Sequence, residues 1–123
     1  MVVIRMTADD AGGAARVCFE AADPLFDGHF PHAPILPGVA LIDAAVALAS
    51  RAVGRALRLE RVANAKFVSA VQPGQEIALG FKVAREPGDP GRVTVNARWT
   101  RGAERVADIA FTAVAADAEG SVP

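Results

Sequence analysis

The amino-acid sequence predicts an α+β domain in which a curved antiparallel β-sheet wraps around one long helix. One apolar stretch, from residue 39 to about residue 57, has the composition of a helix, with alanine and leucine dominant. Two strand-like segments precede this stretch and four follow it. A helix that is apolar on nearly all of its sides must be enclosed, and a sheet that curves around it is the simplest enclosure. This arrangement leaves room for half of the helix's neighbours to come from a second subunit.

The first half of the chain contains two expected strands and the helix. Residues 2–7 are β-branched and apolar, and the turn sequence ADDAGG joins them to a second expected strand at residues 14–22, which predicts a hairpin. We expect the helix to begin at Pro37 and Gly38, because proline keeps the preceding residue out of the helical conformation and glycine is tolerated at a cap. Gly54 is the only later glycine in the predicted helix.

The second half of the chain changes from a helical to an alternating pattern. A strand is expected at about residues 61–71, and every second residue is apolar in segments 77–83, 93–99 and 107–113. The turn sequences PGQE, EPGDPG and RGAE separate these segments. This spacing predicts an antiparallel meander.

Length and composition limit the classes of protein that fit. The 123 residues predict one domain at residues 1–117 with a single core and a frayed tail at 118–123. A net charge of −1 without a block of basic residues argues against nucleic acid as a partner. The lone Cys18 cannot form an internal disulfide, and the amino terminus lacks the apolar core of a signal peptide. The apolar run at 39–49 is too short to span a membrane, so we expect a cytoplasmic protein.

One segment carries most of the functional information. The sequence GHFPHAPILPGV (28–39) holds both histidines of the chain and three regularly spaced prolines, and Asp43 follows it. This segment resembles the active-site motif of the beta-hydroxyacyl-acyl-carrier-protein dehydratases of the FabA/FabZ type. The resemblance is dense over residues 23–43 and thinner through 65–77. It implies the hotdog fold, a substrate carried on acyl carrier protein, and a homodimer or higher oligomer in which His29 and Asp43 of different subunits meet.

Dehydration of a 3-hydroxyacyl thioester needs a base, a proton donor for the departing hydroxyl and a stabiliser for charge on the thioester oxygen. His29 is the candidate base, since a neutral imidazole accepts a proton near neutral pH. A loop histidine with a structural hydrogen bond is the alternative. Asp43 is the candidate acid, because a buried carboxyl holds its proton more tightly. Stabilisation of Asp43 by the helix dipole is a weak alternative, because that effect fades within the first turn.

Gly38 provides the third group through its backbone N–H, which lies where a helix start offers unpaired donors. Glycine also permits close approach of the thioester, although a plain cap glycine is the alternative. His32 is not expected to be catalytic, and Phe26 is expected to be a packing residue. Four residues near the candidate site are expected to contact substrate: Phe30, Pro37, Val39 and Phe67.

Two positions depart from the family pattern that the resemblance implies. Chain-elongation dehydratases with this loop usually carry glutamate where this chain has Asp43, whereas aspartate is typical of relatives that also isomerise the double bond. Dehydratase-like proteins of aryl-polyene and polyketide pathways resemble this mixture. Ala47 occupies a position that is often glutamine, so a polar anchor near the site is lost.

Arg51, Arg55 and Arg58 are spaced to share one helical face, which makes them candidates for docking an acidic carrier protein, although a solvated charged face is the commoner meaning of such a stripe. The sequence contains no metal-binding cluster and no cofactor motif, and the proposed reaction needs neither. Two rival functions stay open, a hotdog acyl thioesterase and a non-catalytic acyl-binding hotdog subunit.

Overall fold

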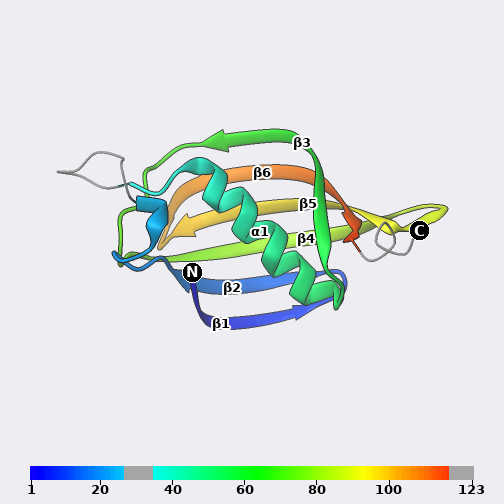
Figure 1. The fold of residues 1–123 in the computed structure, drawn as a ribbon, viewed down its shortest axis with the longest axis horizontal. Helices are drawn as coiled ribbons and strands as arrows, with labels where there is room; N and C mark the ends of the chain where they lie inside the picture. The colour runs from blue at the N-terminus through cyan, green and yellow to red at the C-terminus, as the bar shows by residue number, and fades with distance from the viewer. Residues whose placement is uncertain (27–34, 117–123) are drawn as a thin grey trace.

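The computed structural model describes residues 1–26 and 35–116 of the chain (Figure 1). The predicted six strands and one long helix are confirmed, with a short 3-10 helix in addition. The elements, in chain order, are β1 (Val2–Asp9), β2 (Gly12–Cys18), η1 (Pro24–Phe26), α1 (Gly38–Val53), β3 (Leu57–Phe67), β4 (Glu76–Glu86), β5 (Asp89–Arg101) and β6 (Glu104–Ala115).

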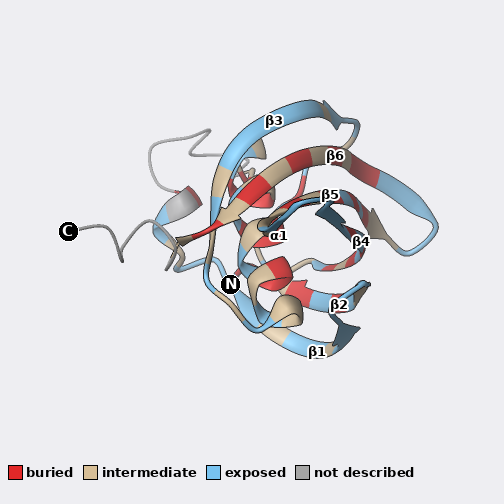
Figure 2. Cartoon of the chain, turned by 90° about the vertical axis from the view of Figure 1, so that its right-hand side faces the viewer, coloured by how far each residue is buried: buried red, intermediate tan, exposed pale blue. Residues whose placement is uncertain are grey.

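The six strands form one antiparallel sheet in the order β1-β2-β4-β5-β6-β3. The sheet curves around α1, with β1 and β3 at its two edges (Figure 2). The β4–β5–β6 meander was predicted, but the position of β3 was not, because its neighbour in the sheet is β6 rather than an adjacent strand in the chain. As a result α1 connects the end of the sheet that contains β1 and β2 to β3 at the opposite edge.

The core lies between the concave side of the sheet and α1. The alternation expected for β4, β5 and β6 is confirmed, since the buried side chains include Leu79, Trp99 and Phe111. Removing such large apolar side chains from water stabilises the fold by about 1.5–3 kcal/mol each. Alanines on the buried side of α1 keep the helix close to the sheet, and the indole N–H of Trp99 donates to the Leu41 carbonyl at 3.2 Å.

The end of α1 differs from the prediction. The helix stops at Val53 because Gly54 adopts a left-handed conformation, with φ at 71°, and its N–H donates to the Ser50 carbonyl at 3.0 Å. Glycine tolerates this conformation at little cost, so it is a common helix terminator. The Ser50 hydroxyl then accepts from the Leu57 N–H at 3.0 Å, which directs the chain into β3. The predicted end of the helix, at residue 57, and the predicted strand at 61–71 therefore both lie about four residues later in the chain than the structure has them.

Within the described residues, one chain does not enclose α1 completely. The sheet covers one side of the helix, while Val39, Asp43 and Ala47, each four residues apart, are exposed along the other side. Val39 has 60% of its surface exposed. Within these residues no helix has the length and apolar character needed to cross a membrane. The predicted tail at 118–123 lies outside the described residues.

Candidate active site

The start of α1 presents backbone N–H groups without intrahelical acceptors. Pro37 is the N-cap residue, with an extended backbone at φ −61° and ψ 143°, and no side chain caps the helix. The first N–H groups of an α-helix have no carbonyl one turn earlier to bind, and they carry the positive end of the helix dipole. The Leu36 N–H donates to the Val71 carbonyl at 2.8 Å and fixes the chain just before this point. The N–H groups of Gly38 and Val39 are therefore suited to an incoming oxyanion.

Phe67 packs directly against Gly38, a contact that sequence reasoning missed. A Cβ atom placed on Gly38 would lie 2.9 Å from the Phe67 Cζ atom and 3.0 Å from Cε1. Real side chains do not approach so closely, so glycine is required at position 38 while the Phe67 ring stays where it is. Phe67 is the last residue of β3, and 47% of its surface is exposed. The ring thus forms one wall beside the amide that opens α1.

Asp43 lies on the exposed side of α1, in the turn after Val39. The prediction that this carboxyl is buried is wrong for a single chain, because the sheet covers the opposite side of the helix. In the part of the chain that the structure describes, Asp43 makes no ion pair or side-chain hydrogen bond, and no polar or charged side chain is fully buried. Its position is nevertheless compatible with a site that begins at Gly38.

An exposed apolar surface surrounds these residues. Val39 of α1 and Phe67 of β3 border Gly38, and Val68, next to Phe67, is 53% exposed. Val62 of β3 is also exposed and has its register partner Phe111 in the core. We call the surface made by Val39, Asp43, Ala47, Val62, Phe67 and Val68 the α1–β3 face.

Two of the predicted site residues, His29 and Phe30, lie outside the described residues, as does His32, which was not expected to be catalytic. The proposed meeting of His29 with Asp43 therefore stays a prediction. Of the remaining predicted residues, Pro37, Gly38, Val39 and Phe67 do gather at the start of α1.

The three arginines predicted to share a helical face do not do so. Arg51 is exposed in the last turn of α1, Arg55 follows the Gly54 cap, and Arg58 lies in β3. The prediction was wrong because it continued the helix through Gly54.

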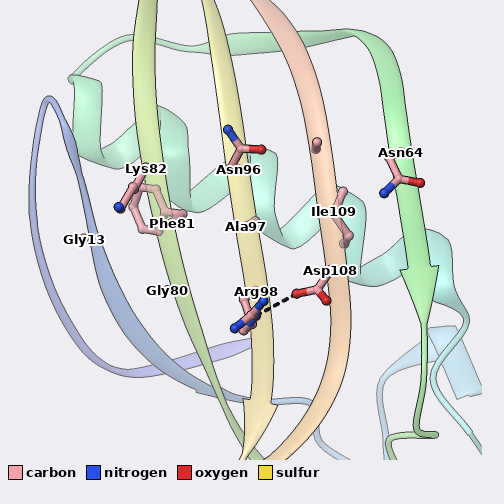
Figure 3. Close-up of a pocket in the computed structure, with 11 residues that line it drawn as sticks. Gly13, Asn64, Gly80, Phe81, Lys82, Asn96, Ala97, Arg98, Asp108 and Ile109 are labelled. Atoms are coloured by element: carbon pink, nitrogen blue, oxygen red, sulfur yellow. Dashed lines mark hydrogen bonds and ion pairs between the residues drawn. The ribbon is translucent and has the colours of Figure 1, made fainter.

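Two other features bear on the choice of site. A hollow of about 650 Å³ lies on the side of the sheet away from α1 and is lined by Lys82, Asn96 and Arg98 among others (Figure 3). This hollow was also missed by sequence reasoning, and it does not include Gly38 or Asp43. Among residues 1–26 and 35–116 no cluster of His, Cys, Asp and Glu side chains is placed to hold a metal ion.

Comparison with known proteins agrees with the motif. A family model described as ApeI-like, ApeI dehydratase, matches residues 6–107. The 3-hydroxyacyl-[acyl-carrier-protein] dehydratase FabZ of Chlamydia pneumoniae is 31% identical over 101 residues, which cover 75% of this chain and 66% of that protein. FabZ of Bacillus subtilis (strain 168) is 29% identical over 101 residues, covering 75% of this chain and 72% of the relative. The matched region thus spans about two thirds of the length of the Chlamydia protein.

Solved structures establish the fold. The dehydratase heterocomplex ApeI:P from Xenorhabdus doucetiae matches with a TM-score of 0.68 at 20% identity, covering 92% of this chain and 96% of that chain. A hypothetical thioesterase from Streptococcus pneumoniae TIGR4, solved with coenzyme A, has the same TM-score of 0.68 at 8% identity, covering 90% of this chain and 84% of that chain. At these identities the likeness shows the hotdog fold alone. The active-site motif, the fold and the family match lead to one conclusion: the chain belongs to the ApeI dehydratase family of FabA/FabZ-type hotdog proteins.

Proposed function

We propose that this protein removes water from a 3-hydroxyacyl thioester on acyl carrier protein and releases the trans-2-enoyl thioester, in fatty-acid or polyene and polyketide biosynthesis. The observation that carries the proposal is the start of α1, where the uncapped N–H of Gly38 lies beside the Phe67 ring and Asp43 follows on the same exposed side. The FabZ relatives support the substrate class by their names.

In the proposed reaction the Gly38 N–H donates to the thioester oxygen, with the Val39 N–H as a second donor. Negative charge builds on that oxygen when the α-proton leaves, and a fixed donor at the positive end of a helix stabilises it in the transition state. The Phe67 ring limits the approach to one direction and keeps water from the amide. Pro37 fixes the backbone that presents both N–H groups.

His29 takes the α-proton as general base, and Asp43 gives a proton to the departing hydroxyl or orients the released water. Asp43 needs a neighbour for this role, because its side of α1 is exposed in a single chain. A second subunit over the α1–β3 face would supply that cover and bring in His29 from the partner, as the family resemblance implies.

A dimer through the α1–β3 face is also favoured by the surface itself. Exposed apolar side chains on one continuous face mark an interaction site, and β3 is an edge strand whose outer backbone groups have no partner strand in the described sheet. We propose a homodimer. The solved ApeI:P dehydratase heterocomplex makes a different chain the alternative partner.

Carrier docking is proposed at Arg51, Arg55 and Arg58, which lie on α1, the connection and β3. The variant Arg55→Glu/Arg58→Glu is expected to raise KM for carrier-bound substrate and to leave kcat nearly unchanged. An unchanged KM would remove these arginines from the docking surface.

The deciding experiment incubates the purified protein with a 3-hydroxyacyl carrier-protein substrate and follows the acyl carrier by mass spectrometry. Loss of one water supports the dehydratase. Release of free acid would instead identify a thioesterase, and an unchanged mass would identify an acyl-binding subunit. Asp43→Asn serves as the matched inactive control.

A further inference from the structure

The side of the sheet that faces away from α1 carries most of the positive charge of the protein. Side chains alternate between the two sides of a strand, and the strand register therefore assigns each residue to one side. Nine of the 13 Lys and Arg side chains lie on the outward side. We call this surface the basic outer face, and its cations are Arg5, Arg16, Arg58, Arg61, Lys66, Lys82, Arg92, Arg98 and Arg105.

Few acids balance these cations. Glu60 pairs with Arg92 at 2.7 Å, Glu76 pairs with Arg16 at 2.6 Å, and Asp9 lies at the tip of the first hairpin. Asp108 accepts from Arg98 Nε at 2.7 Å and lies 3.4 Å from Arg105. The hydrogen bond from Arg98 holds the pKa of Asp108 below its ordinary value, so this acid stays charged and keeps the Arg98 side chain in place.

Several of the cations lack an ion-pair partner in the part of the chain that the structure describes. These are Arg5, Arg61, Lys66 and Lys82, although the net charge of the chain is −1. Lys66 faces its register partner Asp108, whose pKa it helps to lower. Arg5 is the register partner of Arg16, and Arg16 already pairs with Glu76, so Arg5 is the member of this pair that is left to an external anion.

The hollow of about 650 Å³ lies within the basic outer face. Gly80 has no side chain and Ala110 has only a methyl group, so these two residues form its floor. In the register Gly80 is opposite Arg98, and Ala110 lies between Asn96 and Asn64. Figure 3 shows Lys82, Asn96 and Arg98 on neighbouring strands around this hollow. The hollow is also lined by the Asp108 carboxylate, which is paired with Arg98, so Lys82 and the Asn64 and Asn96 amides are the groups left to meet an anionic group there.

We propose that the basic outer face binds the surface of an anionic phospholipid bilayer, with a headgroup phosphate in the hollow. Between its cations on β4, β5 and β6 the face presents small or polar residues such as Ala78, Thr94 and Thr112. None of the outward side chains on these three strands is aromatic. Cations that are spread over a face, with little large apolar surface between them, suffice for attraction to an anionic bilayer. The edge strand β1 adds the exposed apolar Val2 and Ile4 beside Arg5. This proposal does not depend on the proposed dehydratase activity.

The test is co-sedimentation of the full chain with phosphatidylcholine vesicles, compared with vesicles in which about a third of the lipid is phosphatidylglycerol. We expect binding to the anionic vesicles only, and at least tenfold weaker binding as the salt concentration rises from about 0.05 M to about 0.5 M. Equal sedimentation with both kinds of vesicle, or with neither, would overturn the proposal.

Two variants locate the binding surface. Lys82→Glu reverses the charge of one exposed side chain that makes no ion pair among the described residues, and it is expected to weaken binding about tenfold or more. The matched control is Arg85→Glu, because Arg85 is an exposed residue on the same strand as Lys82 but its register partner Val93 lies on the helix side. Thermal unfolding confirms that each variant is folded.

Equal loss of vesicle binding in both variants would show that only the total charge of the protein matters. Variant-sensitive binding of an acidic carrier protein without vesicle binding would assign the face to a protein partner. Either result rules out the lipid assignment.

Discussion

The two sides of the sheet differ in chemistry although they are built from the same strands. On β3, Ala65 and Phe67 point toward α1, whereas Asn64 and Lys66 point outward. The α1–β3 face therefore carries apolar residues together with the acid Asp43, and the outward side of the sheet carries nine cations. Because alternate residues serve the two sides, a substitution on one side should leave the other unaffected. The following predictions test that separation, from the largest expected effect to the smallest.

Loss of a proton-transfer group should have the largest effect. His29→Ala and Asp43→Asn are each expected to lower kcat by about 100- to 10,000-fold, because a positioned acid or base contributes that much to proton transfer. Kinetics with a carrier-bound 3-hydroxyacyl substrate provide the measurement. Thr94→Ala, on the outward side, is the control and should retain normal kcat. Full activity in His29→Ala would remove His29 as the base.

A charge placed on the α1–β3 face should break the proposed dimer. Val39→Glu puts a carboxylate among exposed apolar side chains that a second subunit would bury, which costs several kcal/mol. Size-exclusion chromatography with light scattering should show a monomer, and dehydration should fall with the dimer. Thr94→Glu, on the opposite side of the sheet, should stay dimeric. A dimeric Val39→Glu protein would place the interface elsewhere.

Gly38→Ala should collide with the Phe67 ring, since the new Cβ would lie 2.9 Å from Cζ. We expect a loss of about 1–3 kcal/mol in unfolding free energy, the usual cost of overpacking. Denaturant unfolding of Gly38→Ala, Phe67→Ala and the double variant forms a thermodynamic cycle. The two losses should not add, because the smaller residue at position 67 makes room for the new methyl group. Strict additivity would contradict the contact.

Trp99→Phe should destabilise the fold more modestly. The change removes the hydrogen bond from the indole to the Leu41 carbonyl and leaves that part of the core slightly underfilled. A single buried hydrogen bond contributes about 1 kcal/mol. Urea unfolding should show a lower midpoint with an unchanged slope.

The smallest effect concerns pH. The hydrogen bond from Arg98 lowers the pKa of Asp108 from 3.8, so its stabilising contribution is present above that pH and is lost as the pH falls through the lowered value. Asp108→Asn should therefore reduce the acid sensitivity of the unfolding midpoint below about pH 4 and leave its value at higher pH a little lower. Identical acid profiles for the two proteins would contradict this linkage.

Much of the architecture was predictable because it depends on local patterns. Alternation located β4 to β6, and the Pro37–Gly38 pair located the start of α1. The end of the helix was misplaced because Gly54 looked like an interior glycine, and only its left-handed backbone reveals a cap. The exposure of Asp43 in a single chain was missed because its apolar surroundings in the sequence indicated a buried carboxyl. The burial pattern in Figure 2 shows instead that the sheet covers one side.

Other features required the strand order. The contact between Gly38 and Phe67 joins residues far apart in the sequence and arises because β3 lies at the sheet edge beside the start of α1. The basic outer face could have been predicted in part from the sequence, since Lys66, Lys82 and Arg98 occupy the polar positions of strands in which polar and apolar residues alternate. The strand register was needed to see that these positions lie together.

The location of β3 also bears on how the chain folds. Its neighbour within the sheet is β6, so Leu57 finds its register partner only at Ala115. Pairing over such a long loop is slow, and until β6 has formed both β3 and β5 present unsatisfied backbone groups to other chains. Nascent or truncated protein that lacks the last strand should therefore be the aggregation-prone species, which makes late substitutions in β6 more harmful to yield than their distance from α1 suggests.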